Sequence, residues 1–492
     1  MSLKYFDGLK VDIKTLLYFC RMARRKNTKK TFENVEVVDA GSKGKGIGKA
    51  TDGRVLIIDH VVPGDVVDVL TYKKRKSYYQ AKPLHFVKLS PKRTEPVCQH
   101  FGICGGCKWQ NMAYEHQLFY KEKEVLENLK RIGKVNISET KPILGSKEIY
   151  FYRNKMEFSF SNSRWLTESE INSGTDIQNK NALGFHIPGM WDKILNLDKC
   201  HLQADPSNAI RNKIRDFATE HNLEFFNPRE QTGLLRSLMI RTSSTGEYMI
   251  LIQFYKENEA KRLLLLDYII KEFPEVISLQ YVINQKGNDT IYDQDVILYY
   301  GQDFIYEEME GLKFKINAKS FYQTNSEQAY ELYKVARNFA NLSGEELVYD
   351  LYTGTGTIAQ FVAKKAKHVV GIEAVPEAIE DAKANAELNG IENASFFAGD
   401  MKKIFTPSFI AEHGQPDVII TDPPREGMHK EVVEQILNIQ PKRIVYVSCN
   451  SATQARDLQL MEALYQVDIS QAVDMFPQTH HVENVVCLSL KS

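Results

Sequence analysis

Several features that identify whole classes of protein are missing from this chain of 492 residues. No stretch approaches the roughly 20 consecutive apolar residues that a membrane helix needs, and the apolar segment 15–20 is too short for the core of a signal peptide. Seven cysteines, an odd number in a long chain, argue against a disulfide framework and for metal or nucleophile chemistry in a reducing compartment. We therefore expect a cytoplasmic protein that does not enter a membrane.

Net charge is also missing, because 63 basic side chains balance 63 acidic ones. The balance is not uniform: residues 1–93 hold 21 Lys and Arg against 9 Asp and Glu, which leaves 42 against 54 in the remainder. A basic block on an acidic body favours a nucleic-acid partner over a merely solvated lysine-rich surface. The length itself suggests about three domains.

The basic block has the pattern of a small β-barrel over residues 31–92. Short segments with period-two alternation are separated by glycine and Pro-Gly turns. The cations of segment 73–76 are followed by Tyr78 and Tyr79, whose rings we expect to stack on bases. The motifs Gly-Lys-Gly-Ile-Gly at 44–48 and Val-Pro-Gly-Asp at 62–65 resemble the TRAM domain, an RNA-binding barrel of the OB-like type. Residues 1–30 are predicted to form a flexible basic tail, with Met22 as an alternative start of the native protein.

Four cysteines lie in the next part of the chain, which we interpret as a central α+β domain over residues 93–310. Cys98, Cys104 and Cys107 form a C-x5-C-x2-C pattern, and Cys200 follows. Four thiolates can hold tetrahedral zinc or an iron–sulfur cluster, and the spacing leaves both open. This domain also offers candidate contacts to an RNA backbone at Arg153, Arg236 and Arg241.

From residue 311 to 492 the pattern becomes that of a doubly wound, Rossmann-like sheet. A buried strand at 347–351, a turn containing Gly354 and Gly356, a helix at 358–365 and a strand ending in Glu373 follow one another. Since Ala359 occupies the third position of the dinucleotide fingerprint, a nicotinamide cofactor stays formally open. The context of these glycines, with Asp400 after the third strand, resembles the S-adenosylmethionine-dependent methyltransferases.

Three further motifs lie in the same region, two after strands and the third just before the final strand. They are Asp422-Pro423-Pro424-Arg425-x-Gly427, Ser448-Cys449-Asn450 and His481-x-Glu483. Methyltransferases that act on exocyclic amines place an aromatic residue where Arg425 stands, so N-methylation is disfavoured. Methylation of uracil at C5 requires a thiolate that adds to C6 and a base that removes the C5 proton, and Cys449 and Glu483 are suited to these tasks.

Together these motifs resemble the RNA (uracil-5-)-methyltransferases, closest to the [4Fe–4S]-containing 23S rRNA branch that carries a TRAM domain. The resemblance implies that Cys449 is the nucleophile and Glu483 the base. It implies a [4Fe–4S] cluster on Cys98, Cys104, Cys107 and Cys200, with zinc as the alternative. It assigns contacts with S-adenosylmethionine or the target uracil to Gln323, Tyr352, Gly354, Gly356, Thr357, Glu373, Asp400 and Asp422.

Two departures from the family pattern concern the cofactor loop, where Thr353 replaces a frequent cysteine and Thr357 a usual asparagine. The expected substrate is 23S rRNA, bound by a monomer, with the T-loop of tRNA as the alternative. A non-catalytic RNA-binding or ribosome assembly factor is the rival from another class. A redox enzyme built on the cysteines is a weaker rival, because no motif for a partner cofactor is evident.

Overall fold

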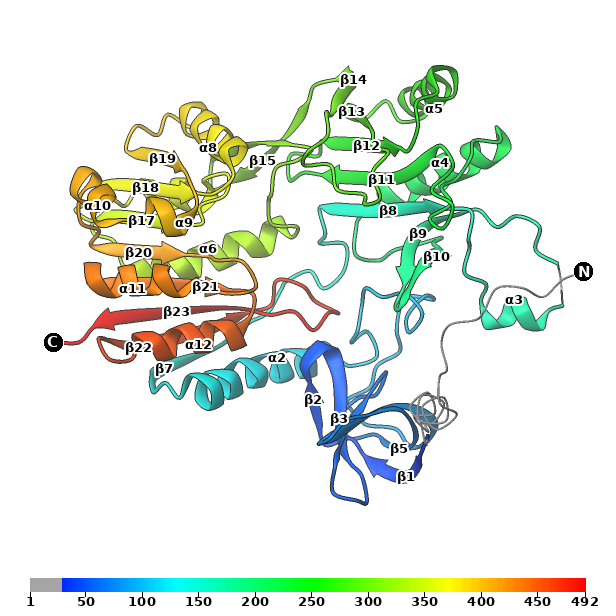
Figure 1. Ribbon diagram of the computed structural model, residues 1–492, viewed down its shortest axis with the longest axis horizontal. Helices are drawn as coiled ribbons and strands as arrows, with labels where there is room; N and C mark the ends of the chain where they lie inside the picture. Colours follow the sequence, from blue (N-terminus) through cyan, green and yellow to red (C-terminus); the bar gives the residue numbers. More distant parts are fainter. Residues whose placement is uncertain (1–28, 175) are drawn as a thin grey trace, which may run out of the picture. The chain divides into compact units, whose positions relative to one another are not determined.

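The computed structural model describes residues 29–174 and 176–492. It divides into two compact units, one ending at Arg93 and the other running from Thr94 to Ser492 (Figure 1). The described residues include only the last two residues of the predicted flexible tail. The alternative start at Met22 lies outside them, and so does the cysteine Cys20. No helix in the described ranges is both long and apolar enough to cross a membrane.

The first unit contains, in its described part, a six-stranded sheet of order β1-β5-β6-β4-β3-β2. The strands are β1 (Thr31–Glu36), β2 (Asp39–Gly41), β3 (Lys45–Lys49), β4 (Val55–Ile58), β5 (Val66–Lys74) and β6 (Tyr78–Lys88), and a 3-10 turn spans Ser42–Gly44. Alternate residues of these strands, such as Leu56 and Val67, form an apolar core. Closure of this sheet into a barrel stays a prediction.

Tyr79 contradicts the prediction that it stacks on bases. Its side chain is only 1% exposed, and its hydroxyl lies 2.8 Å from the Asp52 carboxylate. Period-two alternation turns Tyr79 into the core, whereas the cations of segment 73–76 lie exposed where β5 turns into β6. The hairpin tip therefore offers charge to a partner, and Tyr79 supports it from inside.

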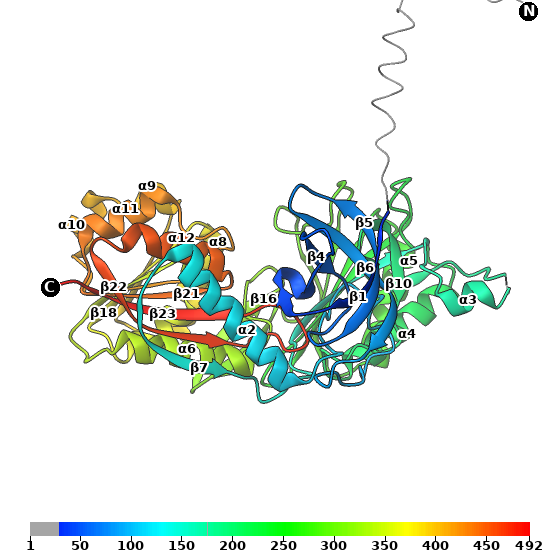
Figure 2. The ribbon, with the colours of Figure 1, turned by 90° about the horizontal axis from the view of Figure 1, so that it is seen from below.

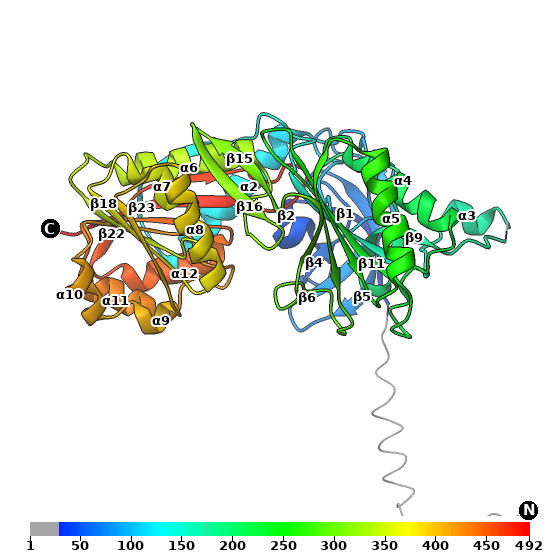
Figure 3. The same cartoon turned by 90° about the horizontal axis from the view of Figure 1, so that it is seen from above.

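The second unit contains a seven-stranded sheet of order β10-β9-β8-β11-β12-β13-β14, counted over the described residues. Helices α4 and α5 pack together beside it (Figure 3). The elements are β8 (Lys155–Ser161), α3 (Glu168–Asn172), β9 (Ala182–Ile187), β10 (Met190–Asn196), α4 (Ser207–Glu220), β11 (Leu235–Thr242), β12 (Tyr248–Phe254), α5 (Glu259–Glu272), β13 (Val276–Ile283) and β14 (Ile297–Gly301).

Two arginines of β11 do not have the predicted role of RNA contacts. Arg236 is 5% exposed and donates to the carbonyls of Asn284 and Lys286, at 2.9 and 2.7 Å. Arg241 is 4% exposed and donates to the carbonyls of Asn317 and Ser320. Both guanidinium groups satisfy buried loop carbonyls, so they hold loops in place.

The C-terminal sheet is the predicted doubly wound one, with order β19-β18-β17-β20-β21-β23-β22-β7 among the described strands. Strands β17 to β21 run parallel and β23 runs antiparallel. Its strands are β7 (Ile137–Leu144), β17 (Leu347–Leu351), β18 (His368–Glu373), β19 (Ala394–Ala398), β20 (Val418–Thr421), β21 (Arg443–Ser448), β22 (Tyr465–Val473) and β23 (Glu483–Leu490). The order reverses between β17 and β20, which is where such sheets bind ligands.

Helices cover both faces of this sheet. They are α2 (Tyr114–Asn128), α6 (Ser326–Ala340), α7 (Thr357–Ala363), α8 (Pro376–Leu388), α9 (Met401–Ile404), α10 (Pro407–His413), α11 (Lys430–Ile439) and α12 (Ser451–Met461), with a π-turn at Leu129–Gly133 after α2. A separate hairpin, β15 (Phe304–Met309) and β16 (Leu312–Asn317), precedes α6.

The predicted linear division at residue 310 is wrong for the segment around α2 and β7. Strand β7 pairs in parallel with β22 at the edge of the C-terminal sheet, and α2 packs against α12 (Figure 2). Residues 94–492 accordingly form one unit. The chain thus brings the segment that follows Cys107 onto the sheet that carries Cys449 and Glu483.

Candidate active site

The turn after β17 is built from residues in left-handed backbone conformations. Tyr352, Gly354 and Gly356 have φ values of 64°, 56° and 76°. A Cβ at Gly356 would lie 2.9 Å from the Cβ of Ala382, so close packing requires glycine there, whereas a Cβ at Gly354 would meet nothing within 4 Å. Gly354 therefore faces open space, where a ligand can approach the backbone.

Two acidic residues flank this turn at the ends of neighbouring strands. Glu373, at the end of β18, accepts hydrogen bonds from the backbone N–H groups of Gly354, at 3.2 Å, and Ala374, at 2.7 Å. Asp400 is exposed and caps α9 by accepting from the N–H of Lys402. Thr357, largely buried, is the first residue of α7. These sequence-predicted residues meet at one edge of the sheet.

Asp350 begins the Asp-x-x-x-Gly-x-Gly motif that resembles the S-adenosylmethionine-dependent methyltransferases, although it was not assigned a contact of its own. Its side chain is 1% exposed, and its Oδ2 accepts from the Thr353 hydroxyl at 2.5 Å. Its Oδ1 has no hydrogen-bond partner in the described part of the chain. Burial raises the pKa of Asp350 to about 7. A buried acid with one unused oxygen is rare without a functional reason.

Cys449 and Glu483 lie side by side because their strands are neighbours. Ser448 of β21 pairs with Asn484 of antiparallel β23, so the next step along the ladder brings Cys449 to Glu483. Burial, then the charges of Glu483 and Asp422, raise the pKa of Cys449 to about 11, while Arg425 opposes this through its charge and a hydrogen bond. Burial and the nearby Asp422 also raise the pKa of Glu483 to about 8.

Asp422 completes the group from the end of β20. Burial, then the charge of Asp350, raise its pKa to about 7. Burial, then the charges of Asp422, Asp350 and Glu483, raise the pKa of Tyr333 above its ordinary range. One thiol and three carboxyl groups therefore share a poorly solvated edge of the sheet.

The loop that carries Asp422 and Arg425 is held on the start of α12. The carbonyl of Arg425 accepts from Asn450 Nδ2 at 3.0 Å and from Thr453 Oγ1 at 3.1 Å. Asp457 Oδ2 accepts from the N–H of Met428 at 2.9 Å. Gly427 has φ 78°, and a Cβ there would lie 2.6 Å from Asp457 Oδ2. The Asp-Pro-Pro-Arg-x-Gly motif thus needs its glycine for both conformation and packing.

Gln323 lies in the loop before α6. Its carbonyl accepts from Asn154 Nδ2 at 2.9 Å, which ties this loop to the seven-stranded sheet. Two residues earlier, Phe321 is 67% exposed, consistent with a ring that is free to meet a base. Asn325 ends the loop by capping α6.

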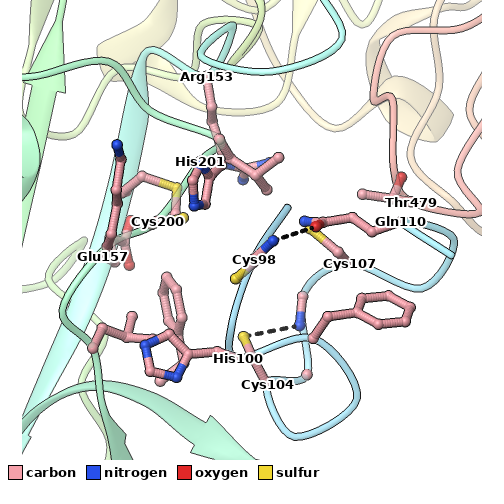
Figure 4. Close-up of a pocket in the computed structure, with 18 of the residues that line it drawn as sticks. Cys98, His100, Cys104, Cys107, Gln110, Arg153, Glu157, Cys200, His201 and Thr479 are labelled. Atoms are coloured by element: carbon pink, nitrogen blue, oxygen red, sulfur yellow. Dashed lines mark hydrogen bonds between the residues drawn. The ribbon is translucent and has the colours of Figure 1, made fainter. Parts of the chain in front are cut away.

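The four predicted metal ligands line one cavity of about 660 Å³ (Figure 4). Burial raises the pKa of Cys104 to about 11 and of Cys107 to about 12, and the pKa values of Cys98 and Cys200 are raised for the same reason. Over the described residues, no three His, Cys, Asp or Glu side chains are arranged to hold a single metal ion. The cavity wall also includes Thr479 and His481, close in sequence to Glu483.

Comparison with known proteins identifies the family. The family described as tRNA (Uracil-5-)-methyltransferase matches residues 278–491. A Bacteroides thetaiotaomicron protein described as an uncharacterized RNA methyltransferase is 58% identical over 453 residues, which are 92% of this chain and 100% of the relative. A Porphyromonas gingivalis relative with the same description is 54% identical, over 92% of this chain and 99% of its own.

The chain belongs to the RNA (uracil-5-)-methyltransferase family. The crystal structure of the Pyrococcus abyssi tRNA (uracil-54, C5)-methyltransferase in complex with S-adenosyl-L-homocysteine superposes with a TM-score of 0.72 at 27% identity. The match covers 92% of this chain and 100% of that one. The protein is therefore an S-adenosylmethionine-dependent RNA methyltransferase with a mixed α/β, Rossmann-like fold. Membership sets aside the nicotinamide, N-methylation, redox and non-catalytic alternatives.

Proposed function

We propose that this methyltransferase converts a specific uridine of 23S rRNA into 5-methyluridine through a covalent bond between Cys449 and uracil C6. The observation that carries this proposal is the pairing of β21 with β23, which sets a thiol beside a buried carboxyl group. Asp422 and Arg425 join them from the loop after β20. A thiol, a base and hydrogen-bonding groups for the pyrimidine edge are the parts that C5 methylation needs.

The reaction begins when the Cys449 thiolate adds to C6. The electron pair of the C5–C6 bond moves toward C5 and the O4 carbonyl, which makes C5 nucleophilic. The hydrogen bond and charge of Arg425 favour the thiolate, against the burial that disfavours it. Because burial keeps part of the Asp422 population protonated, its carboxyl group can donate a hydrogen bond to a uracil carbonyl.

C5 takes the electrophilic methyl group of S-adenosylmethionine as the sulfur–methyl bond breaks, and S-adenosylhomocysteine is the leaving group. Glu483 then accepts the proton on C5, the electron pair of that C–H bond restores the C5–C6 double bond, and the C6–sulfur bond breaks. Cys449 leaves as a thiolate and RNA carrying 5-methyluridine is released. The raised pKa of Glu483 suits it to take up this proton near neutral pH.

The residues that would hold S-adenosylmethionine are those gathered at the reversal of strand order. The open face of Gly354 and the Glu373 carboxylate beside it fit a ribose and its hydroxyl groups. The unused oxygen of Asp350 and the exposed carboxylate of Asp400 offer acceptors nearby. Gln323, Tyr352, Gly356, Thr357 and Asp422 complete the proposed set.

For the cysteines we propose a [4Fe–4S] cluster, with zinc as the alternative. Four half-buried thiols on one cavity are a suitable donor set for either group. The resemblance to the [4Fe–4S]-containing branch is what favours the cluster over zinc. Anaerobic purification followed by absorption spectroscopy and iron and zinc analysis tests this; stoichiometric zinc without iron would overturn it.

The choice of RNA follows from the resemblance to the cysteine-containing, TRAM-bearing branch. The T-loop of tRNA is the alternative, because the Pyrococcus abyssi neighbour acts on uracil 54 of tRNA. Mapping 5-methyluridine in 23S rRNA and tRNA from a strain lacking this protein decides between them. We expect one rRNA site to be lost and restored by the wild-type gene but not by Cys449→Ala. Loss of a tRNA site alone would support the alternative.

The role of Glu483 is tested by Glu483→Gln. The amide cannot accept the C5 proton, so we expect a methylated RNA–protein adduct that persists on a denaturing gel, with turnover reduced at least about 100-fold. Binding of S-adenosylhomocysteine, measured by calorimetry, should be unchanged. Normal turnover in this variant would remove Glu483 from the reaction.

A further inference from the structure

A nine-residue loop, 474–482, connects β22 to β23 and ends directly before Glu483. We call this segment the base loop. The base loop is held mainly by residues 108–121, which begin directly after Cys107 and continue into α2. The reaction described above uses none of these contacts. They join the cysteine segment to the proposed base.

The first contact is a buried ion pair. Lys121 Nζ lies 2.6 Å from Asp474 Oδ1, and both side chains are fully buried. Asp474 Oδ2 accepts from the Tyr114 hydroxyl at 3.0 Å, and Lys121 also donates to the carbonyl of Phe476 at 3.2 Å. The α2 helix thus clamps the start of the base loop.

The second contact is a reciprocal amide pair. Gln117 Nε2 donates to Gln478 Oε1, and the backbone N–H of Gln478 donates to Gln117 Oε1, both at 3.0 Å. The carbonyl of Gln478 accepts from the backbone N–H groups of Lys108 and Trp109, at 2.8 and 3.0 Å. Gln478 has φ 67°, a conformation that costs energy for a side chain of this kind and persists when its surroundings impose it.

The third contact is with the cysteine cavity itself. Thr479 and His481 of the base loop lie on the wall of that cavity together with the four cysteines. The Tyr152 hydroxyl, from the segment that leads into β8, donates to the carbonyl of Pro477 at 2.9 Å. The base loop is therefore bonded to residues 108–121 and to Tyr152, and two of its residues line the cysteine cavity.

We propose that Gln117, Lys121 and Asp474 are positioning residues, through which the cysteine segment sets the orientation of the Glu483 carboxylate. The inference rests on the proposed function of Glu483 as the base. Proton transfer needs the base within hydrogen-bond reach of C5–H, and a displacement of about 1 Å can cost about 100-fold in rate. Addition of Cys449 to C6 does not need Glu483 as a base. Loosening the base loop should therefore slow decay of the methylated adduct more than its formation.

Gln117→Met tests this in the full-length, metal-loaded enzyme, because methionine keeps the volume but not the hydrogen bonds. Single-turnover reactions with radiolabelled S-adenosylmethionine and substrate RNA give adduct formation and decay separately. We expect decay to slow at least about 10-fold, with formation and S-adenosylhomocysteine affinity within about twofold of wild type. Gln253→Met is the matched control, since Gln253, on β12 of the seven-stranded sheet, is also buried and donates to the carbonyl of Asp289 in the loop after β13.

Gln478→Asn is the second variant, and asparagine tolerates the left-handed backbone. It removes the side-chain partner of Gln117, while the backbone bonds from Lys108 and Trp109 can persist. We therefore expect adduct decay to slow here too, but by less than in Gln117→Met. If Gln117→Met does not fold, adduct decay in Gln478→Asn is compared with wild type instead. Wild-type decay in both variants, with a persistent adduct in Glu483→Gln, would overturn the positioning role alone. Absence of an adduct in Glu483→Gln would instead refute the proposed function.

Discussion

Carboxyl groups with raised pKa values surround the single thiol at the centre of the proposed site. Burial is the largest cause for Asp350, Asp422, Glu483 and Cys449 alike, and their charges reinforce one another. Without a cofactor, these four groups oppose one another's ionisation. A cationic sulfonium cofactor is a natural complement to it, because a positive charge placed there favours the ionised forms.

The pH dependence of the two halves of the reaction follows from these shifts. The Cys449 thiol must lose a proton before methyl transfer, and the Glu483 carboxyl group must be ionised to take up the C5 proton afterwards; their pKa values are raised to about 11 and about 8. In single-turnover reactions we expect the log rate of adduct formation to rise with a slope near one up to about pH 11. The log rate of adduct decay should rise with a slope near one up to about pH 8 and then level off. Glu483→Gln should leave the first profile unchanged and remove the rise in the second. An adduct-decay rate that falls between pH 6 and 8 would contradict the assignment.

We expect Asp350 to lower the stability of the fold and to strengthen cofactor binding. Its folded-state pKa of about 7 lies above the unfolded value of about 3.9, so ionisation destabilises the fold increasingly as pH rises between these values. Asp350→Asn should raise the unfolding temperature at pH 8 by roughly 2–4 °C, as expected for about 1 kcal/mol, and by less at pH 5. S-adenosylhomocysteine affinity should fall. Calorimetry measures both, and an equal stability change at the two pH values would contradict the argument.

At the scale of elements, the site depends on one loop and one helix meeting closely. The loop after β20 packs on the start of α12 through Gly427 and Asp457. Tyr446 of β21 donates to the same Asp457 oxygen at 2.8 Å, so strand, helix and loop share one carboxylate. The position of Arg425 beside Cys449 is a consequence of this shared contact.

Gly427→Ala tests that consequence. The new Cβ would need Asp457 to move and would also occupy a left-handed backbone position, which costs about 1–2 kcal/mol. We expect kcat to fall at least about 10-fold. Gly246→Ala is the matched control, because Gly246 has φ 81° but a Cβ there meets nothing within 4 Å. Equal activity of the two variants would show that packing at Gly427 is unimportant.

At the scale of the whole molecule, zero net charge is the sum of two unlike parts. The surplus of 21 basic over 9 acidic residues falls in the unit that ends at Arg93. Within the described part of that unit, the hairpin tip between β5 and β6 holds four consecutive exposed cations. We propose that this tip contacts an RNA backbone.

Replacing the four cations of the hairpin tip tests this. The alanine variant of Lys73, Lys74, Arg75 and Lys76 should bind substrate RNA more weakly at every salt concentration. It should also lower the slope of log affinity against log salt by about three, from roughly 0.7–0.9 per phosphate contact. Fluorescence anisotropy measures both quantities. A matched control replaces four exposed lysines of the C-terminal unit, Lys364, Lys365, Lys367 and Lys383. Equal slopes for the two variants would contradict the proposal.

The sequence alone was sufficient to predict features that depend on neighbours along the chain. Strands such as 347–351 and 368–373 have the expected bounds, because hydrophobic runs between turn residues are local signals. The order of motifs along the C-terminal sheet likewise predicted that the cofactor-site candidates lie at one edge, since parallel strands end together.

Only the tertiary structure decided which side chains meet across long separations. It buried Tyr79, Arg236 and Arg241, which sequence patterns had assigned to RNA. It also placed β7 beside β22 and Gln117 against Gln478, residues more than 300 positions apart. Such pairings depend on how sheets and helices share one core, and no local pattern encodes them. For this methyltransferase, the parts of the reaction are visible in the sequence, but the support of its proposed base is visible only in the fold.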